Sequence, residues 1–362
     1  MCCGTTTNHM QNYNCKNCGA VLYWDTKENC LNCQYCGSKY QPEEFEDYTD
    51  TTEQVQSEEA QQEYTNATVG EDMCVYECKN CGGEIVTLKT TMATICPYCS
   101  EAVSITSKSA GDFRPKMCIP FSKDKEEITK LYKSYVNHSF LTPRKFKEQN
   151  TIEKYQGLFA PFYLHTIDDE ASHVFEGEKL SSHRRGDDRV TVHSVYELQL
   201  DAEAVFERIP TDGSVRIDDK LMEAIEPFDY EGCRDYNPAY MAGFAAEQTD
   251  DEEQVLRERA LQRAKKSMES KARESFAGYS SLMLKRDSHK IKSHESEYVM
   301  LPVWLLNVNY NGKKYTFAVN GQTGKVSGRL PMDKLKLTLL IAGTYLGTSL
   351  IAGLIMGLGG IL

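Results

Sequence analysis

The chain has 362 residues, of which 40% are hydrophobic and 10% aromatic, so it carries enough apolar material for about two packed domains. A formal net charge of −12 argues against a surface coated for nucleic acid. The chain opens Met1-Cys2-Cys3-Gly4-Thr5, without the basic and then apolar run of a secretory signal. We therefore expect its 14 cysteines to lie in a reducing compartment.

Eight of these cysteines form two copies of one pattern. Each copy has two Cys-x-x-Cys pairs separated by fourteen residues, and the second copy repeats the first 63 positions later. Two such pairs facing each other supply the four sulfur ligands of a tetrahedral zinc site. We predict two zinc ribbons that each bind one Zn²⁺, because so short a unit needs a metal to fold. The predicted ligands are Cys15, Cys18, Cys33 and Cys36 in the first ribbon, and Cys78, Cys81, Cys96 and Cys99 in the second.

Other interpretations of the cysteines are open. A disulfide framework would need an oxidising compartment, and a thioredoxin-like pair would begin a helix that follows a strand. Cys30 also forms a Cys-x-x-Cys with Cys33, although the match of Tyr35 to Tyr98 in the second copy favours the pair Cys33 and Cys36. We interpret the six cysteines outside the repeat as free thiols: Cys2, Cys3, Cys30, Cys74, Cys118 and Cys233.

An acidic segment, 41–72, separates the two copies. It has eleven acidic and no basic residues, so it cannot bury enough apolar surface to offset its ordering entropy and is predicted to be a flexible, disordered linker. The ribbons would then behave as beads on a string. The predicted fold class is α+β, divided into ribbon 1 (1–40), the acidic linker (41–72), ribbon 2 (73–105), a short linker (106–115), a central antiparallel-sheet-plus-helix domain (116–333) and a membrane anchor (334–362).

Periodicity assigns the elements of the central domain. Asp124 and Glu127 form a capping box ahead of a helix, residues 218–225 form a short helix, and a second capping box, 249–252, opens a long helix that runs to Phe276. Asn311-Gly312 predicts a β-hairpin. Alternation predicts strands at 158–166, 171–180, 190–200, 299–310, 314–319 and 325–328. Residues 160–164 resemble 301–305, which is either a duplicated helix-plus-sheet unit or chance.

No enzyme motif stands out. A Walker A sequence, a His-Glu-x-x-His, a Gly-x-Ser-x-Gly and a Gly-x-Gly-x-x-Gly are all absent from the chain, so we predict that the protein is not an enzyme. Four histidines fall in the strand region and could meet at a metal, but we favour plain surface residues for them: His165, His173, His183 and His193.

The last 26 residues, 337–362, carry no charge. A helix of that length spans about 39 Å, enough to cross a bilayer core of roughly 30 Å, and predicts one transmembrane helix. Basic residues precede it, so the soluble part is expected in the cytoplasm, on a single-pass protein of the bacterial cytoplasmic membrane. Two small-xxx-small pairs, Gly343 with Gly347 and Gly353 with Gly357, could pair this helix with a second one.

Several stretches together resemble a known bacterial family over about residues 76–362. The stretches are the twin cysteine repeats, of which the first looks like an added copy, Phe113-Arg114-Pro115, Ile119-Pro120-Phe121, Ala160-Pro161-Phe162-Tyr163, Ile225-Glu226-Pro227-Phe228-Asp229-Tyr230, 238–244, and 301–306 through 320–325. They resemble membrane proteins with a transcription-factor-IIB-type zinc ribbon, often labelled replication-restart helicase or phage replisome proteins. One relative is similar to a membrane protein encoded beside phage-shock protein A, which implies assembly of envelope-stress proteins at the membrane. The resemblance implies no catalytic residues, only the ribbon cysteines.

Three functional hypotheses follow. The first is a membrane-anchored, cytosol-facing scaffold whose zinc ribbons dock protein partners at the bilayer. The second is a zinc-ribbon accessory factor that binds nucleic acid in replication or transcription, which the near balance of acidic and basic residues in each ribbon disfavours. The third is an enzyme that uses the central domain.

Overall fold

The computed structural model describes residues 10–11, 13–48, 73–77, 84–88, 90–96, 102–105, 115–149, 151–186, 188–214, 217–249 and 252–359. Within these ranges the chain is a mixed α+β protein. Eleven strands form one large sheet, three strands form a small sheet near the N-terminus, and two strands form a separate hairpin.

The large sheet runs in the order β1-β8-β7-β13-β10-β14-β15-β16, with β11 paired to β10 and with β9 and β12 at its side. Most of its pairings are antiparallel, and β10 with β13 and β14 with β9 are parallel. Its strands are β1 (Met10–Gln11), β7 (Thr91–Ile95), β8 (Ala102–Ile105), β9 (Met117–Cys118), β10 (Thr151–Arg185), β11 (Asp188–Asp212), β12 (Arg234–Asp235), β13 (Ala245–Glu247), β14 (Ser281–Tyr310), β15 (Lys313–Asn320) and β16 (Val326–Gly328).

The smaller sheets and the helices complete the fold. The three-stranded sheet holds β2 (Leu22–Asp25), β3 (Cys30–Cys33) and β4 (Lys39–Tyr40), and the hairpin holds β5 (Met73–Glu77) and β6 (Glu84–Leu88). The α-helices are α1 (Lys125–His138), α2 (Arg144–Gln149), α3 (Asp219–Ala224), α4 (Glu253–Ser275) and α5 (Lys334–Gly359), and the 3-10 helices are η1 (Pro42–Tyr48), η3 (Tyr230–Gly232) and η4 (Pro238–Met241).

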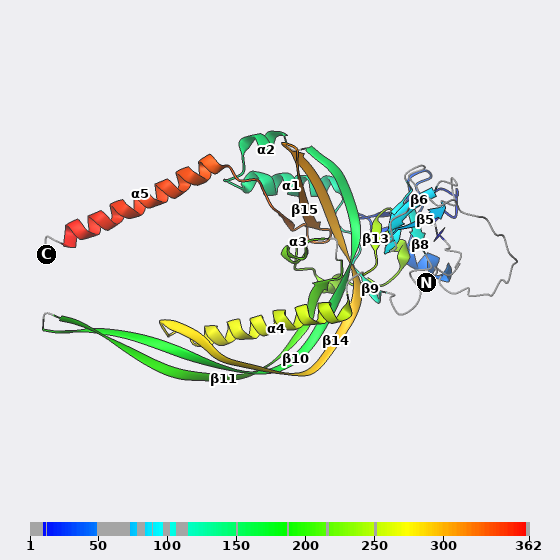
Figure 1. The fold of residues 1–362 in the computed structure, drawn as a ribbon. Helices are drawn as coiled ribbons and strands as arrows, with labels where there is room; N and C mark the ends of the chain where they lie inside the picture. The colour runs from blue at the N-terminus through cyan, green and yellow to red at the C-terminus, as the bar shows by residue number, and fades with distance from the viewer. Residues whose placement is uncertain are drawn as a thin grey trace.

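Three long strands give the molecule its shape. β10 and β14 pair from Thr151 with Asn309 to Glu178 with Ser281, and β11 extends the ladder on the other side of β10. Figure 1 shows these strands curving into an arm, with α4 along its inner side and α5 projecting from the opposite part of the sheet. The arm is the largest difference from the sequence prediction, which divided β10 into two strands and began β14 at Val299.

Two local predictions have different outcomes. Asp124 caps α1 with the predicted reciprocal hydrogen bonds to Glu127, so this capping box is confirmed. The prediction of a capping box at 249–252 is wrong. Helix α4 begins at Glu253, and its N-cap residue, Glu252, makes no side-chain cap hydrogen bond. The Thr249 hydroxyl instead donates to the Gly213 carbonyl at 3.0 Å, which ties the approach to α4 to the end of β11.

The β14–β15 hairpin forms where predicted. Asn311 and Gly312 both have positive φ angles, 52° and 72°, which a type I′ turn requires at its two central residues. The two similar segments, 160–164 and 301–305, lie on neighbouring antiparallel strands and meet at one pair, Ala160 opposite Leu301. Each belongs to a strand that follows a helix, an arrangement in keeping with a duplicated unit.

The first cysteine segment packs against the large sheet rather than hanging from it. The Trp24 indole donates to the Phe121 carbonyl at 3.2 Å and its ring lies 5.0 Å from that of Tyr240. Gly243 has a φ of 90°, and a Cβ there would lie 2.9 Å from the Tyr23 ring, so only glycine allows this close approach. The beads-on-a-string expectation is therefore wrong for residues 13–48, because aromatic burial joins the segment to the sheet.

The predicted acidic linker also begins later than expected. Residues 42–48 form η1, and the Phe45 side chain is buried against Tyr13 and Tyr40. One aromatic residue therefore orders the start of a segment whose composition alone predicted disorder. Residues 49–72 and the predicted linker 106–114 lie outside the described residues.

α5 is long and apolar enough to cross a membrane. The stretch Lys334–Gly353 has a mean hydropathy of 1.5, and none of it is buried against the rest of the structure. Its first turn is fixed: Asp333 accepts hydrogen bonds from the backbone N–H of Leu335, and the Lys336 ammonium donates to the Thr142 carbonyl at 3.1 Å. The helix is thereby attached to the α1–α2 connection.

Candidate metal centre

Two tight backbone turns position the sulfurs of the first cysteine copy. The Gly19 N–H donates to the Cys15 carbonyl at 2.8 Å, and the Gly37 N–H donates to the Cys33 carbonyl at 2.9 Å. Both glycines have positive φ angles, 77° and 74°, which side chains rarely adopt. Each Cys-x-x-Cys therefore bends back on itself and directs its two side chains to one point.

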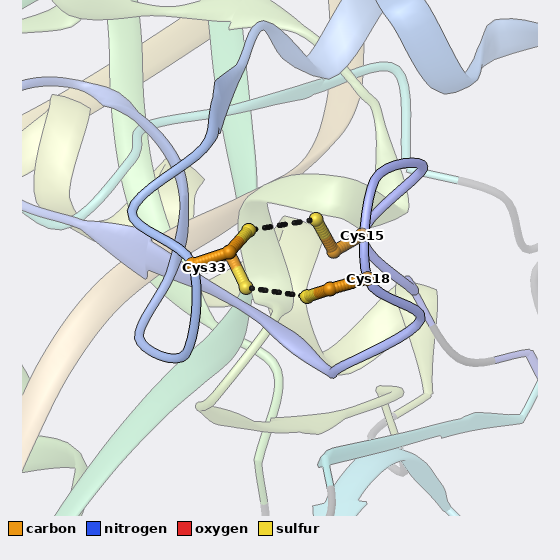
Figure 2. Close-up of side chains that lie close together, drawn as sticks. Cys15, Cys18 and Cys33 are labelled. Atoms are coloured by element: carbon orange, nitrogen blue, oxygen red, sulfur yellow. Dashed lines mark hydrogen bonds between the residues drawn. The ribbon is translucent and has the colours of Figure 1, made fainter.

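The four sulfurs converge between the turns. Cys15 Sγ lies 3.5 Å from Cys36 Sγ, and Cys18 Sγ lies 3.5 Å from Cys33 Sγ. All four atoms lie within 4.8 Å of one another, and Figure 2 shows Cys15 and Cys18 facing Cys33 from the opposite turn. Zinc–sulfur bonds of about 2.3 Å in a tetrahedron place sulfurs about 3.8 Å apart, so these residues fit a tetrahedral metal ion.

The ionisation of the thiols matches such a centre. Burial raises the pKa of Cys15, but hydrogen bonds from the Tyr40 hydroxyl and from the N–H groups of Cys18 and Asn17 outweigh it and lower that pKa to about 5. The Ala20 N–H lowers the pKa of Cys18, but burial and the neighbouring sulfurs raise it to about 12. The Cys15 thiolate therefore forms readily, whereas a Cys18 thiolate needs a cation to balance its charge.

One side of the centre is covered and the other is open. Cys15 and Cys33 are buried in the hydrophobic core, whereas Cys18 and Cys36 are exposed. The Ser38 hydroxyl lies 3.1 Å from Cys36 Sγ and is the main cause of a lowered pKa at that thiol. A metal here would therefore join the core to an exposed surface.

The remaining cysteines have different positions. Cys30 is buried on β3, opposite Asp25, and is not part of the four-sulfur group. Cys118 and Cys233 are free thiols, as predicted. In the second copy, Cys96 is buried after β7, while Cys78, Cys81 and Cys99 lie outside the described residues, so the second zinc site stays a prediction.

The four histidines of the strand region divide into two kinds. His183 and His193 are exposed, as predicted, but the surface interpretation is wrong for His165 and His173, which are both fully buried under α4. Sequence reasoning also missed their neighbours on β14: His165 Nδ1 lies 3.0 Å from His294 Nε2, and a second group joins His173, Asp287 and His289. No local spacing marks these residues, because pairing of distant strands brings them together.

Comparison with known proteins gives a relative along nearly the whole chain. The uncharacterized protein YdjG of Bacillus subtilis (strain 168) is 30% identical over 352 residues, covering 96% of this chain and 98% of its own length. Such an alignment includes both the cysteine segment and the large sheet. No family model matches the chain. No solved structure matches it either.

Proposed function

The chain belongs to the same family as Bacillus subtilis YdjG, and we propose that it is a membrane-anchored zinc protein that docks protein partners at the bilayer. In this proposal α5 holds the chain in the cytoplasmic membrane, the large sheet supports the cysteine centre, and an exposed turn of that centre contacts the partner. The resemblance found in the sequence makes envelope-stress proteins the proposed class of partner.

The anchor is supported by the exposure of α5. An apolar helix with no buried side in Lys334–Gly353 needs a non-aqueous environment, because leaving so many apolar side chains in water is costly. Lys325, Arg329, Lys334 and Lys336 precede the apolar part and favour a cytoplasmic soluble portion. A Cβ at Gly343 or Gly347 would meet nothing within 4 Å, so that side is free for a second helix, and we propose pairing there.

Zinc is the metal that this donor set favours. Four thiolates at tetrahedral spacing make a closed structural site without an open position for catalysis. We propose one zinc ion on Cys15, Cys18, Cys33 and Cys36, and a second on the corresponding cysteines of the repeat. The ion would fix both turns and so make their outer surface rigid.

The docking role rests mainly on one exposed aromatic side chain. Tyr35 lies in the turn between Cys33 and Cys36 and is 84% exposed. Aromatic residues held on rigid turns give binding energy at a low entropic cost, and tyrosine is enriched in binding hot spots. The adjacent cysteine ligands would hold Tyr35 in place for a partner.

A crosslinking experiment on the full-length protein in membranes tests this role. Tyr35→Ala should remove the crosslinked partners that the wild type captures, with the zinc content unchanged. Phe140→Ala is the matched control, because this residue is also an exposed aromatic, at 68%, but lies beside α5. Retention of every partner by Tyr35→Ala would contradict the proposal. Point variants are needed because removal of the N-terminal residues would strip part of the core.

The nucleic-acid alternative is the second candidate, and charge disfavours it. The three lysines of residues 13–48 have partners within the chain: Lys16 donates to the Glu44 carbonyl, Lys27 lies 2.7 Å from Asp124, and Lys39 pairs with Glu28. Paired lysines attract phosphate weakly. A salt-dependent mobility shift of DNA or RNA with the full-length protein would support this alternative instead.

A further inference from the structure

A second cluster of metal-ligating side chains lies on the arm, far along the chain from the cysteines. In the β10–β14 ladder His173 lies opposite Asp287, and Ala171 lies opposite His289. Successive side chains of a strand point to opposite faces of the sheet. The side chains of Ala171 and His173 therefore lie on the same face of β10 as Ile167, which packs against Ala260 and Ala264 of α4. The cluster therefore lies on the face of the arm that α4 covers, and Figure 1 shows α4 running along the arm.

The buried polar atoms of this cluster are incompletely satisfied. The His173 side chain is fully buried, the His289 side chain is 5% exposed, and the Asp169 side chain is fully buried beside them. Both ring nitrogens of His173 and the Nε2 of His289 lack a hydrogen-bond partner. Buried imidazoles in folded proteins normally have partners, so these nitrogens indicate a missing ligand.

The distances show where that ligand would lie. Asp287 Oδ1 lies 3.0 Å from His173 Nδ1 and 3.0 Å from His289 Nε2, although neither contact is aligned as a hydrogen bond. On its other side, His289 Nδ1 lies 2.6 Å from Asp169 Oδ2 and donates to it. With Nδ1 engaged by Asp169, the Nε2 of His289 faces the Asp287 carboxylate oxygen. One ligand atom each of His173, Asp287 and His289 therefore lies within 4.8 Å of the others, close enough for a single cation to contact all three.

We propose that His173, His289 and Asp287 bind a divalent first-row transition metal ion, with Asp169 as the residue that orients His289. Metal–nitrogen and metal–oxygen bonds of about 2.0 to 2.2 Å place two ligands at a right angle about 3.0 Å apart, which matches both measured distances. A carboxylate on the far nitrogen of a metal-bound histidine fixes its tautomer, and Asp169 is placed for this role. Two imidazoles and one carboxylate favour zinc, iron or manganese over calcium.

The site lies where it can hold the arm in register. Irregularities in the β10–β14 ladder flank it, between Asp168 and Asp169 on one side and between Val174 and Phe175 on the other. A metal bound to both strands would fix their pairing between these two points. Asp287 is 35% exposed and gives the ion a route from solvent.

Cobalt titration of the full-length, metal-free protein tests the site separately from the cysteines. Cobalt bound to thiolates has a strong near-ultraviolet charge-transfer band, whereas cobalt on imidazole and carboxylate has none. We expect the wild type to bind one equivalent of cobalt more than its charge-transfer intensity accounts for. The zinc content of the protein, measured by elemental analysis, should likewise exceed the zinc bound by the cysteines by one ion per chain.

Matched variants decide the assignment. His173→Gln and Asp287→Asn should each bind one equivalent less, with the charge-transfer band unchanged, while His183→Gln, an exposed histidine on the same strand, should bind as the wild type does. Asp287→Asn serves if His173→Gln fails to fold, because Asp287 is partly exposed. Equal stoichiometry in Asp287→Asn and the wild type would overturn the proposal and identify the cluster as a metal-free network with a protonated His289. If the cysteines bound no metal, the charge-transfer band would be absent, but the equivalent of cobalt bound by the histidine cluster would remain.

Discussion

The two side-chain clusters are assembled in opposite ways. The cysteine centre draws its sulfurs from two turns no more than 21 positions apart, whereas His289 and its partner Asp169 lie 120 positions apart on different strands. The cysteine centre is half exposed, while the histidine cluster is mostly enclosed between the arm and α4. Local backbone turns determine the first geometry, and the register of a long ladder determines the second.

This difference also separates the two centres chemically. Soft thiolates favour zinc in a closed tetrahedral site, and imidazole with carboxylate accepts a wider set of divalent ions. The cysteines belong to the N-terminal segment, and the histidine cluster belongs to β10 and β14, which form the arm in Figure 1. Each centre should therefore be removable without loss of the other.

The largest expected effect is on the cysteine centre itself. Cys33→Ser removes a buried thiol of the proposed zinc site, and three thiolates should not retain the ion, whose binding in zinc-finger peptides contributes about 10 to 16 kcal/mol. We expect the zinc content to fall by one ion per chain. Elemental analysis of the purified full-length protein measures this change.

Cys30→Ser is the matched control, because this cysteine is buried on the same strand but is outside the four-sulfur group. It should keep the full zinc content. Loss of zinc from the Cys30 variant but not from Cys33→Ser would contradict the assignment of Cys33 as a ligand and would show that local spacing does not identify the zinc ligands.

The same contrast explains what the sequence could predict. The sulfur group could be derived from spacing, because a Cys-x-x-Cys turn is a local structure that Gly19 and Gly37 support. The histidine cluster could not, because whether His173 points inward depends on a ladder with three register shifts. Propensity likewise could not show the docking of Trp24, since that contact requires Phe121 and Tyr240 from distant parts of the fold.

The second effect tests the attachment of the cysteine segment to the sheet. Trp24→Ala removes a buried ring and the hydrogen bond to Phe121, and should lower the free energy of unfolding by about 3 to 5 kcal/mol. Denaturant unfolding of the detergent-solubilised protein measures this loss.

Tyr35→Ala is the control for truncation of an aromatic residue in the same segment. Because Tyr35 is exposed, its removal should change the free energy of unfolding by less than about 0.5 kcal/mol. Equal effects of the two variants would mean that the segment is not held to the sheet in solution.

The third effect concerns the arm and depends on pH. Burial, followed by repulsion from His294 and Arg257, lowers the pKa of His165 from 6.5 to about 4. Between these values the unfolded chain binds a proton that the folded chain does not, so stability falls as the pH falls from 6.5 to 4. The loss should reach about 3 kcal/mol, since one pKa unit corresponds to about 1.4 kcal/mol.

Unfolding midpoints measured across this pH range would show the slope. His165→Gln should flatten it, and the exposed His183→Gln should leave it unchanged. A slope that persists in His165→Gln would contradict the assignment of this pH dependence to His165.

The smallest effect lies at the joint between the two regions, where Asp124 has two roles. It caps α1 through the Glu127 N–H, and it pairs with Lys27 of the cysteine segment at 2.7 Å. Asp124→Ala should lower the free energy of unfolding by about 1 kcal/mol through the lost cap, whereas Lys27→Ala removes only a solvent-exposed ion pair and should change it less. High salt should reduce the effect of Lys27→Ala and leave most of the effect of Asp124→Ala, because capping by a short hydrogen bond is screened less than an exposed pair. Equal losses from both variants at low salt would mean that the ion pair, not the cap, is the main contribution of Asp124, and that charge as well as aromatic packing joins the cysteine segment to the sheet.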